Sequence, residues 1–236
     1  MIIDGKAIAE SIQNEIKQQI SLQEGRHPCL AVILVGDHPA SHLYVKRKVQ
    51  SCKIVGIRSI FHHLSVDTSE KTLSHLINEL NADANVDGIL VQLPLPVHID
   101  KSNIISCISP SKDVDGLHPL NAGKLLIEDA SGFVPCTPLG IKTLLARAAI
   151  PVSGKHVVIL GRSNLVGKPL AALLMQNQPG ANATVTVAHS HTVNLKELCS
   201  TADILVAAIG QPKFVTADMV SPHCYVIDVG INKIDD

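Results

Sequence analysis

An apolar run that ends in a glycine and leads into a helix constrains the fold of this chain more than any other stretch. The segment Val157–Pro169 has the sequence VVILGRSNLVGKP, with glycines at Gly161 and Gly167 and the apolar run Leu170–Met175 after it. This order predicts a buried parallel strand, a tight turn and a helix N-terminus. Such a terminus presents backbone N–H groups and the positive end of the helix dipole, which suit a pyrophosphate. The stretch predicts either a nucleotide site or an ordinary strand-to-helix turn.

Two further features bear on which nucleotide such a turn would bind. The full dinucleotide fingerprint would have glycines at 161, 163 and 166, but Ser163 and Val166 occupy the last two places. An NAD enzyme normally carries an acid at the end of the next strand, to bind the ribose hydroxyls. Here that strand ends in HSHT, where Ser190 offers a hydroxyl, and Arg162 lies in the first turn. This combination tolerates a 2′-phosphate and favours NADP.

Composition narrows the class of protein. The chain has 236 residues, of which 46% are hydrophobic and 17% charged, so it can bury a core. Its net charge of −1 and its 2% of aromatic residues provide neither a basic surface nor a stacking platform for nucleic acid. No stretch is apolar enough for a membrane span, and the N-terminus MIIDGKAIAE does not resemble a signal peptide. A cytoplasmic enzyme is expected, with neither nucleic acid nor membrane as a partner.

Cysteine and histidine spacing gives no sign of a metal site. The six cysteines are widely spaced and include no C-x-x-C pair, which favours buried, reduced thiols over a zinc site or a disulfide framework. The histidines, His62 and His63 among them, also lack the spacing of metal ligands and are interpreted as structural or solvated. No metal is expected.

Apolar runs and helix-like segments alternate along most of the chain. This alternation predicts an α/β protein with parallel strands covered by helices on both faces. The expected strands are 29–35, 57–63, 88–93, 155–160, 183–188, 203–208 and 224–229, and the expected helices are one ending near Gly25, 41–54, one capped by Thr68 or Ser69, 137–149, 168–177 and 194–200.

Residues 109–137 interrupt the alternation, because they are rich in glycine and proline and predict a long loop. After it, Thr137 and Pro138 have the types expected for the N-cap and first position of a helix. We place the boundary between two domains within 138–153, and divide the chain into residues 1–140 and 141–236.

Three polar residues in the first half are candidates for chemistry. Tyr44 and Lys48 are four residues apart, so they share one face of the predicted helix that follows the turn GDHPAS. Gln92 lies near the end of the third predicted strand. Ligands of open α/β sheets bind at the carboxyl ends of the strands, so these side chains are expected at one cleft. The alternative is a solvated lysine and a glutamine satisfied by neighbouring backbone.

The loop sequence KDVDG, Lys112–Gly116, adds two acids. Aspartates in such loops usually stabilise turns through their side chains. Alternatively, a carboxylate that projects into a cleft can accept two N–H donors from a nitrogen heterocycle.

Six motifs, in one order, carry a family resemblance. They are YVKRK (44–48), VQLPLP (91–96), KDVDG (112–116), PCTP (135–138), GRSNLVGKP (161–169) and DVGIN (228–232). Together they resemble the bifunctional methylenetetrahydrofolate dehydrogenase/methenyltetrahydrofolate cyclohydrolase family (FolD), over essentially the whole chain.

The resemblance implies an N-terminal α/β folate and catalytic domain, a C-terminal Rossmann-like domain that binds NADP, and a folate cleft between them, usually in a homodimer joined through the nucleotide domain. It implies NADP-dependent oxidation of 5,10-methylenetetrahydrofolate to 5,10-methenyltetrahydrofolate, followed by hydrolysis to 10-formyltetrahydrofolate, in one-carbon metabolism and purine biosynthesis.

The resemblance also implies roles for individual residues. Lys48 is the key catalytic residue, held by Tyr44 and Gln92, which also contact the substrate, and Asp115 binds the pterin ring. For the cofactor, the residues implied are Gly161, Arg162, Ser163 and Gly167 around the phosphates, Ser190 near the 2′-phosphate and Ile231 near the nicotinamide.

The family continues past DVGIN into a glycine- and proline-rich segment and a last helix, whereas this sequence ends at Asp236. We expect it to be part of a longer chain. The alternatives are a truncated folate- or nucleotide-binding protein without turnover and a monofunctional NAD-dependent dehydrogenase of the same family.

Overall fold

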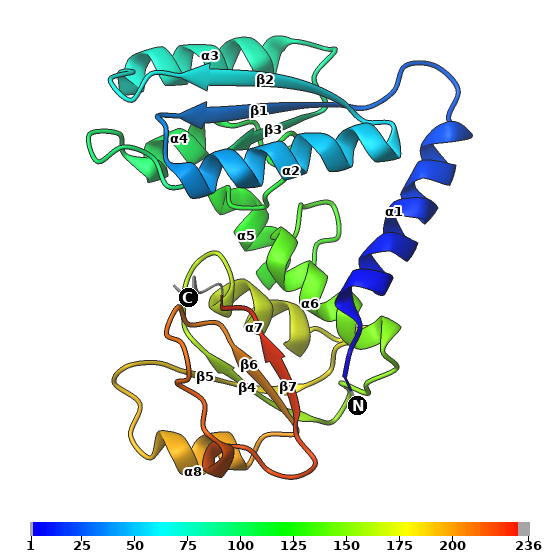
Figure 1. Ribbon diagram of the computed structural model, residues 1–236, viewed down its shortest axis with the longest axis vertical. Coiled ribbons are helices and arrows are strands. Elements are labelled where there is room, and N and C mark those ends of the chain that lie inside the picture. Colours follow the sequence, from blue (N-terminus) through cyan, green and yellow to red (C-terminus); the bar gives the residue numbers. More distant parts are fainter. Residues whose placement is uncertain (1, 231–236) are drawn as a thin grey trace. The chain divides into compact units, whose positions relative to one another are not determined.

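The computed structural model describes residues 2–230, which form two compact units that divide between residues 121 and 122 (Figure 1). Each unit is built around its own parallel β-sheet. The α/β class and the two-domain organisation predicted from the sequence are therefore confirmed.

The first unit contains a three-stranded sheet of order β2-β1-β3, with β1 at Cys29–Val35, β2 at Arg58–Leu64 and β3 at Gly88–Val91. Strand β1 is in the middle, and both of its faces are covered, so its sequence CLAVILV is apolar throughout. The helices of this unit are α1 (Gly5–Ser21), α2 (Pro39–Val55), α3 (Glu70–Ala82) and α4 (Lys101–Cys107), and α5 (Pro119–Leu126) begins at its end.

Alternate residues of β1 point to opposite faces and pack against different helices. Ala31, Ile33 and Val35 belong to a cluster with Leu73 and Ile77 of α3. The intervening Val32 and Leu34 pack with Val45 and Val49 of α2. Helix α2 therefore covers one face of the sheet and α3 the other, as Figure 1 shows.

The second unit contains a four-stranded sheet of order β5-β4-β6-β7. Its strands are β4 (His156–Leu160), β5 (Thr184–Ala188), β6 (Ile204–Ala207) and β7 (Tyr225–Asp228). Its helices are α6 (Cys136–Arg147), α7 (Gly167–Met175) and α8 (Leu195–Ser200), with a 3₁₀ turn, η1, at Ala217–Met219. Helix α7 packs on β4 and β5, and Val158, Leu160 and Leu205 form a cluster with Cys199 of α8 and Met219 of η1.

Several local predictions need correction. The supposed loop 109–137 contains α5, whose sequence PLNAGKLL is short and includes a glycine, so the helical pattern was hidden. Helix α6 begins at Cys136 with Pro135 in the N-cap position, so Thr137 lies inside the helix and does not cap it. Strand β3 ends at Val91, before the cis peptide bond between Leu93 and Pro94.

Two other sequence-based expectations also differ from what the structure shows. Only Cys29 and Cys199 of the six cysteines are buried, and Cys136 is exposed, so the expectation of buried thiols was too broad. The proposed domain boundary between 140 and 141 falls within α6, whereas the compact units meet between 121 and 122. The boundary between 140 and 141, as the point that separates a folate-binding domain from an NADP-binding domain, stays a prediction.

Candidate active site

Lys48 and Gln92 meet at the sheet of the first unit. Gln92 directly follows β3, and Lys48 lies on α2, which covers the same sheet. The Lys48 ammonium donates a hydrogen bond to Oε1 of Gln92 over 3.4 Å. Both side chains are half-buried, so they are held in place and still reach solvent. A cationic donor and an amide acceptor thus lie together beside the carboxyl end of β3.

Backbone contacts orient the Gln92 side chain. Its main-chain N–H donates to the carbonyl of Ile33 over 2.8 Å, which continues the pairing of β3 with β1. Its side-chain Nε2 donates to the carbonyl of Leu93 over 2.8 Å. With the amide nitrogen occupied, the oxygen is the atom presented to Lys48.

Tyr44 lies one helical turn before Lys48 on α2 and is half-buried. Between them, Val45 is 3% exposed and packs against the sheet. Residues four apart on a helix are neighbours on its surface, so Tyr44 and Lys48 flank the buried stripe together. The face shared by these two residues, predicted from their spacing, is present in the structure.

Two charged residues of the loop KDVDG, Lys112 and Asp113, have structural roles. Asp113 is 1% exposed and accepts hydrogen bonds from the His118 N–H at 2.7 Å and from Asn121 Nδ2 at 2.9 Å. Lys112 donates to the carbonyls of Leu80, Asn81 and Asp83 at the end of α3. Lys112 thereby ties the loop to the end of α3, a role that sequence reasoning missed because this residue looks like an ordinary surface charge. Asp113 stabilises the turn, which is the role that the sequence favours for aspartates in such a loop.

Asp115 is the remaining acid of this loop, and it is half-buried. The preceding Val114 packs with Val45, Val49 and Leu90, on the face of the sheet that α2 covers. Asp115 directly follows a residue that packs on the α2 side of the sheet, and Asp113 is the acid that stabilises the turn.

In the second unit, the turn after β4 requires its glycines. Gly161 has a φ of +112°, and a Cβ there would lie 2.5 Å from the carbonyl oxygen of Ala208. Gly167 begins α7, and a Cβ there would lie 2.0 Å from the carbonyl oxygen of Gly161. Strand end, turn and helix start are packed backbone against backbone. The prediction of a strand, a tight turn and a helix N-terminus at this place is confirmed.

A cavity of about 490 Å³ opens beside this turn, and residues from four segments line it. Among them are Gly161 and Arg162 from the turn and His189, Ser190 and Thr192 from the loop after β5. Ser163 does not line the cavity; its Oγ accepts a hydrogen bond from the Val166 N–H at 3.1 Å, which stabilises the turn. Ile231 lies outside the described residues.

The electrostatic surroundings of this cavity are positive. Partial burial, with the nearby positive charges of Arg162 and His191 as further causes, lowers the pKa of His189 below its ordinary value. An anion placed here would meet the Arg162 guanidinium, the Ser190 hydroxyl and the backbone of the turn. No acidic side chain lines the cavity among the described residues.

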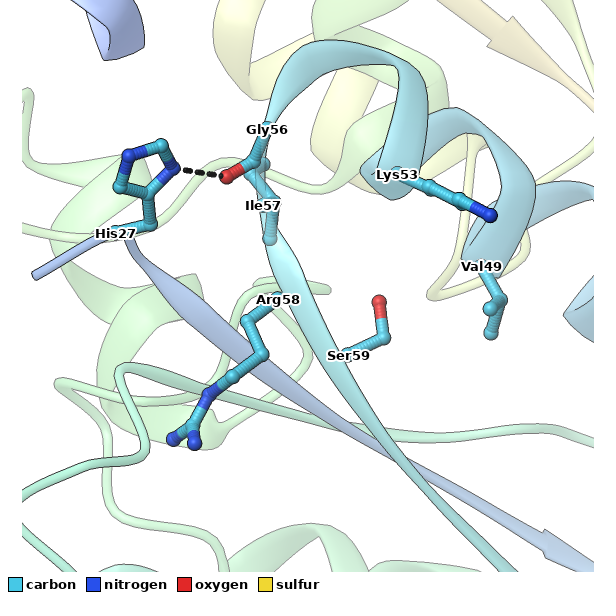
Figure 2. Close-up of a pocket in the computed structure, with 7 residues that line it drawn as sticks. All are labelled: His27, Val49, Lys53, Gly56, Ile57, Arg58 and Ser59. Carbon is cyan, nitrogen blue, oxygen red and sulfur yellow. Dashed lines mark hydrogen bonds between the residues drawn. The ribbon is translucent and has the colours of Figure 1, made fainter.

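A second cavity, of about 460 Å³, lies in the first unit, at the end of the sheet where β2 begins and away from Gln92. Figure 2 shows it beside the end of α2 and the beginning of β2, where a ring nitrogen of His27 is 2.8 Å from the carbonyl oxygen of Gly56. Its lining includes Lys53 and Ser59 but none of the residues predicted to act on a substrate.

Within residues 2–230, no helix combines the length and apolar character needed to cross a membrane.

Comparison with known proteins assigns both units to one family. Residues 3–115 match the catalytic domain of tetrahydrofolate dehydrogenase/cyclohydrolase, and residues 135–236 match its NAD(P)-binding domain. The bifunctional protein FolD of Protochlamydia amoebophila is 61% identical over all of this chain and 81% of its own length. The FolD protein of Campylobacter curvus is 53% identical over all of this chain and 81% of its own length.

Solved structures agree with this assignment. The FolD methylenetetrahydrofolate dehydrogenase/cyclohydrolase of Campylobacter jejuni has a TM-score of 0.96 and 46% identity, over 100% of this chain and 83% of that one. The Trypanosoma brucei enzyme, solved with NADP and an inhibitor, has a TM-score of 0.93 and 36% identity, over 100% of this chain and 80% of that one. The chain belongs to the tetrahydrofolate dehydrogenase/cyclohydrolase family.

Proposed function

We propose that, in the dehydrogenase and cyclohydrolase reactions of this bifunctional enzyme, Lys48 of the first unit is the central catalytic residue and the β4–α7 turn of the second unit is the NADP site. The reactions are the NADP-dependent oxidation of 5,10-methylenetetrahydrofolate and the hydrolysis of the resulting 5,10-methenyltetrahydrofolate to 10-formyltetrahydrofolate. The observation that carries the proposal is the hydrogen bond of 3.4 Å between Lys48 and Gln92 at the carboxyl end of β3.

In the oxidation step, the main task of the protein is to align the folate with the cofactor. NADP, when bound, accepts the hydride, and the two folate nitrogens stabilise the cation that is left. The protein therefore contributes by holding the folate in one orientation. Asp115 serves this purpose in our proposal, because its carboxylate can accept two N–H bonds from the pterin ring.

The hydrolysis step requires water at the methenyl carbon and removal of a proton. Lys48 is the group proposed to assist this step, either as a base in its neutral amine form or, as the ammonium, as a hydrogen-bond donor to the developing product. Gln92 fixes the position of the ammonium, and the Tyr44 hydroxyl adds a second polar group on the same helix face. The hydrogen bond between Lys48 and Gln92 and the position of Tyr44 one helical turn before Lys48 support this division of roles.

The residues of the second unit fit NADP. The β4–α7 turn leads into the N-terminus of α7, where backbone N–H groups suit phosphates, and Gly161 lines the adjoining cavity. Arg162 and Ser190 line the cavity and suit the 2′-phosphate, and Ser163 and Gly167 shape the turn. Ile231, carried over from the family for the nicotinamide end, is part of the same proposal. We also propose a cytoplasmic homodimer with tetrahydrofolate one-carbon derivatives as its substrates.

An assay that follows NADPH and the methenyl intermediate separately tests the proposal. Purified protein is mixed with methylenetetrahydrofolate and NADP. Wild type is expected to form NADPH without accumulating the methenyl compound. Lys48→Met should lower hydrolysis by about 10²–10⁴-fold, the usual contribution of acid–base groups, and should still bind NADP. Lys46→Met is the matched control, because Lys46 is exposed on the same helix.

Each result has a definite meaning. Hydrolysis that persists in Lys48→Met at the wild-type rate would remove Lys48 from its proposed role. Absence of NADPH with wild type would instead indicate a binding protein without turnover. A strong preference for NAD would contradict the NADP site and favour a monofunctional dehydrogenase.

A further inference from the structure

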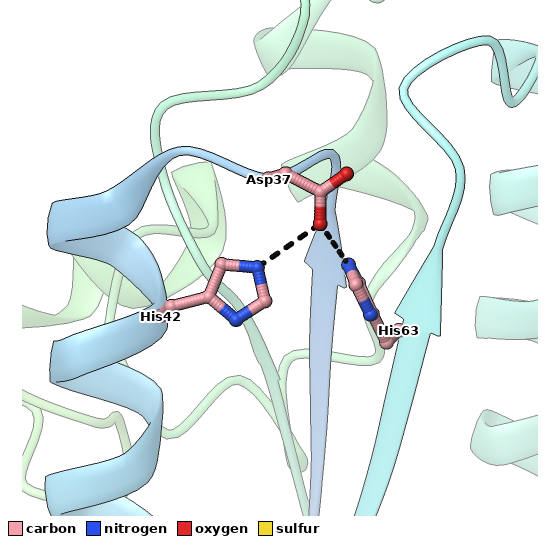
Figure 3. Close-up of side chains that lie close together, drawn as sticks. All are labelled: Asp37, His42 and His63. Carbon is pink, nitrogen blue, oxygen red and sulfur yellow. Dashed lines mark hydrogen bonds and ion pairs between the residues drawn. The ribbon is translucent and has the colours of Figure 1, made fainter.

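Three potential metal ligands gather at the carboxyl end of the first sheet. Figure 3 shows Asp37 in the turn after β1, His42 on the first turns of α2 and His63 near the end of β2. Nε2 of His42 lies 3.2 Å from Oδ1 of Asp37, and Nε2 of His63 lies 3.1 Å from the same oxygen. One ligand atom from each of the three side chains lies within 4.8 Å of the other two.

These separations suit a tetrahedral ion. Zinc binds imidazole nitrogen at about 2.0–2.1 Å and carboxylate oxygen at about 2.0–2.2 Å, so neighbouring tetrahedral ligands lie roughly 3.3–3.5 Å apart. The two oxygen-to-nitrogen separations, 3.2 and 3.1 Å, are close to that spacing. Nε2 of His63 also lies 3.2 Å from the carbonyl oxygen of Gly36, so this ring would exchange that hydrogen bond for the ion. Small rotations of the two half-exposed rings would then bring their nitrogens to the same spacing.

The exposure of the three side chains also fits an ion with an open position. His42 and His63 are 39% and 40% exposed, and Asp37 is 77% exposed. Two imidazoles and a carboxylate would fill three positions and leave the fourth to water, a donor set typical of zinc and related ions. The rings of His42 and His63 contact edge to face, with centroids 4.9 Å apart, and both direct Nε2 to the carboxylate.

We propose that Asp37, His42 and His63 form a binding site for one divalent transition-metal ion of the zinc class. The ion would tie the turn after β1 and the start of α2 to the end of β2. That turn leads directly into the helix that carries Tyr44 and Lys48. Binding should therefore make the β1–α2 junction more rigid and raise the temperature of unfolding.

The experiment measures zinc binding to the whole chain, prepared without a histidine tag and dialysed against a chelator. Titration calorimetry with zinc chloride should show one ion per chain for wild type. His42→Gln and His63→Gln should each weaken binding at least about tenfold, since even groups that only hydrogen-bond to a ligand change metal affinity by 10–100-fold. His75→Gln is the matched control, because His75 is exposed and lies beside Glu79, one turn later on α3.

A spectroscopic measurement on wild type makes the result independent of the variants' folding. X-ray absorption of the zinc-loaded protein should show two imidazole ligands and light oxygen ligands. Circular dichroism checks that each variant is folded. The proposal is overturned if wild type shows no one-to-one binding, if the absorption spectrum lacks two imidazoles, or if folded His42→Gln and His63→Gln bind zinc as His75→Gln does.

Discussion

At the scale of single residues, the turn after β4 shows how a backbone can leave no room for a side chain. Gly161 combines a φ of +112° with a position against the Ala208 carbonyl, and Gly167 faces the Gly161 carbonyl in the same way. Gly161 is therefore required both for its positive φ and for the close approach of the Ala208 backbone. Gly167 is required for the close approach of the Gly161 backbone alone.

Gly161→Ala should destabilise the protein and weaken NADP binding together. An L-residue held in a sparsely populated backbone region costs of order 1–3 kcal/mol, and the new Cβ would also displace the Ala208 backbone. Urea unfolding and NADP titration measure the two effects. Gly210→Ala is the control, because nothing lies within 4 Å of a Cβ there. Equal NADP affinity in wild type and Gly161→Ala would contradict the proposed cofactor turn.

At the scale of elements, helix α3 depends on a cap at its first turn. The Ser69 hydroxyl accepts a hydrogen bond from the Thr72 N–H over 3.1 Å, and Leu73 and Ile77 of the same helix are fully buried in the core. The cap thus orients a helix that covers one face of the first sheet.

Ser69→Ala should lower the free energy of unfolding by about 1 kcal/mol, with a usual range of 0.5–2, because the Thr72 N–H loses its acceptor. Ser69→Asp should retain most of the stability, since aspartate caps helices as well as serine does. Urea unfolding followed by circular dichroism compares the three proteins. If alanine and aspartate gave the same loss, the effect would not arise from the cap.

The contact between α8 and η1 predicts a pH dependence. The Lys196 ammonium, 2.7 Å from Asp218, and a hydrogen bond from Thr216 lower the pKa of the Asp218 carboxyl from 3.8 to about 2. Because this pKa is lower in the folded state, the ion pair stabilises the fold fully above pH 3.8 and loses its effect as the pH falls through about 2.

Asp218→Asn should therefore lower the unfolding temperature slightly at pH 7, and the difference from wild type should shrink between pH 4 and pH 2. Both partners are more than half exposed, so added salt should also reduce the difference. Thermal unfolding at several pH values measures this, with Lys196→Met as the second variant. A difference that stays constant from pH 7 to pH 2 would exclude the ion pair as its cause.

At the scale of the whole molecule, the second sheet has an edge that suits association. Within the part of the chain that the structure describes, β7 is an edge strand, and its residues Tyr225 and Val226 are 37% and 44% exposed. An edge strand with exposed apolar side chains is a ready surface for pairing with a second copy. This supports the proposed homodimer.

Light scattering should give a mass of about twice the 25.1 kDa of one chain. Val226→Lys should shift the mass toward the monomer, since lysine on an edge strand opposes pairing. Val193→Lys is the control, because Val193 is 82% exposed in a loop outside the sheet. A monomeric wild type, or a Val226→Lys variant that remains dimeric, would contradict an interface at β7.

Much of the fold follows from local patterns in the sequence. Apolar runs such as Cys29–Val35 predict buried strands wherever they occur, because both faces of a parallel sheet are covered. The glycine at 161 predicts a tight turn because it alone tolerates the required φ. The neighbourhood of Lys48 and Gln92 was also predictable, since strand ends of a parallel sheet meet at one edge.

The sequence by itself thus determined the α/β class, the order of strands and helices, the glycine turn and the family. Tertiary structure alone decided which of the two acids in the loop is structural: Asp113 is buried and accepts hydrogen bonds from His118 and Asn121, which the residue pattern does not reveal. It also brought together Asp37, His42 and His63 from two elements and a turn. Strand and helix periodicity is a property of neighbouring residues, whereas contacts between distant side chains depend on how whole elements pack.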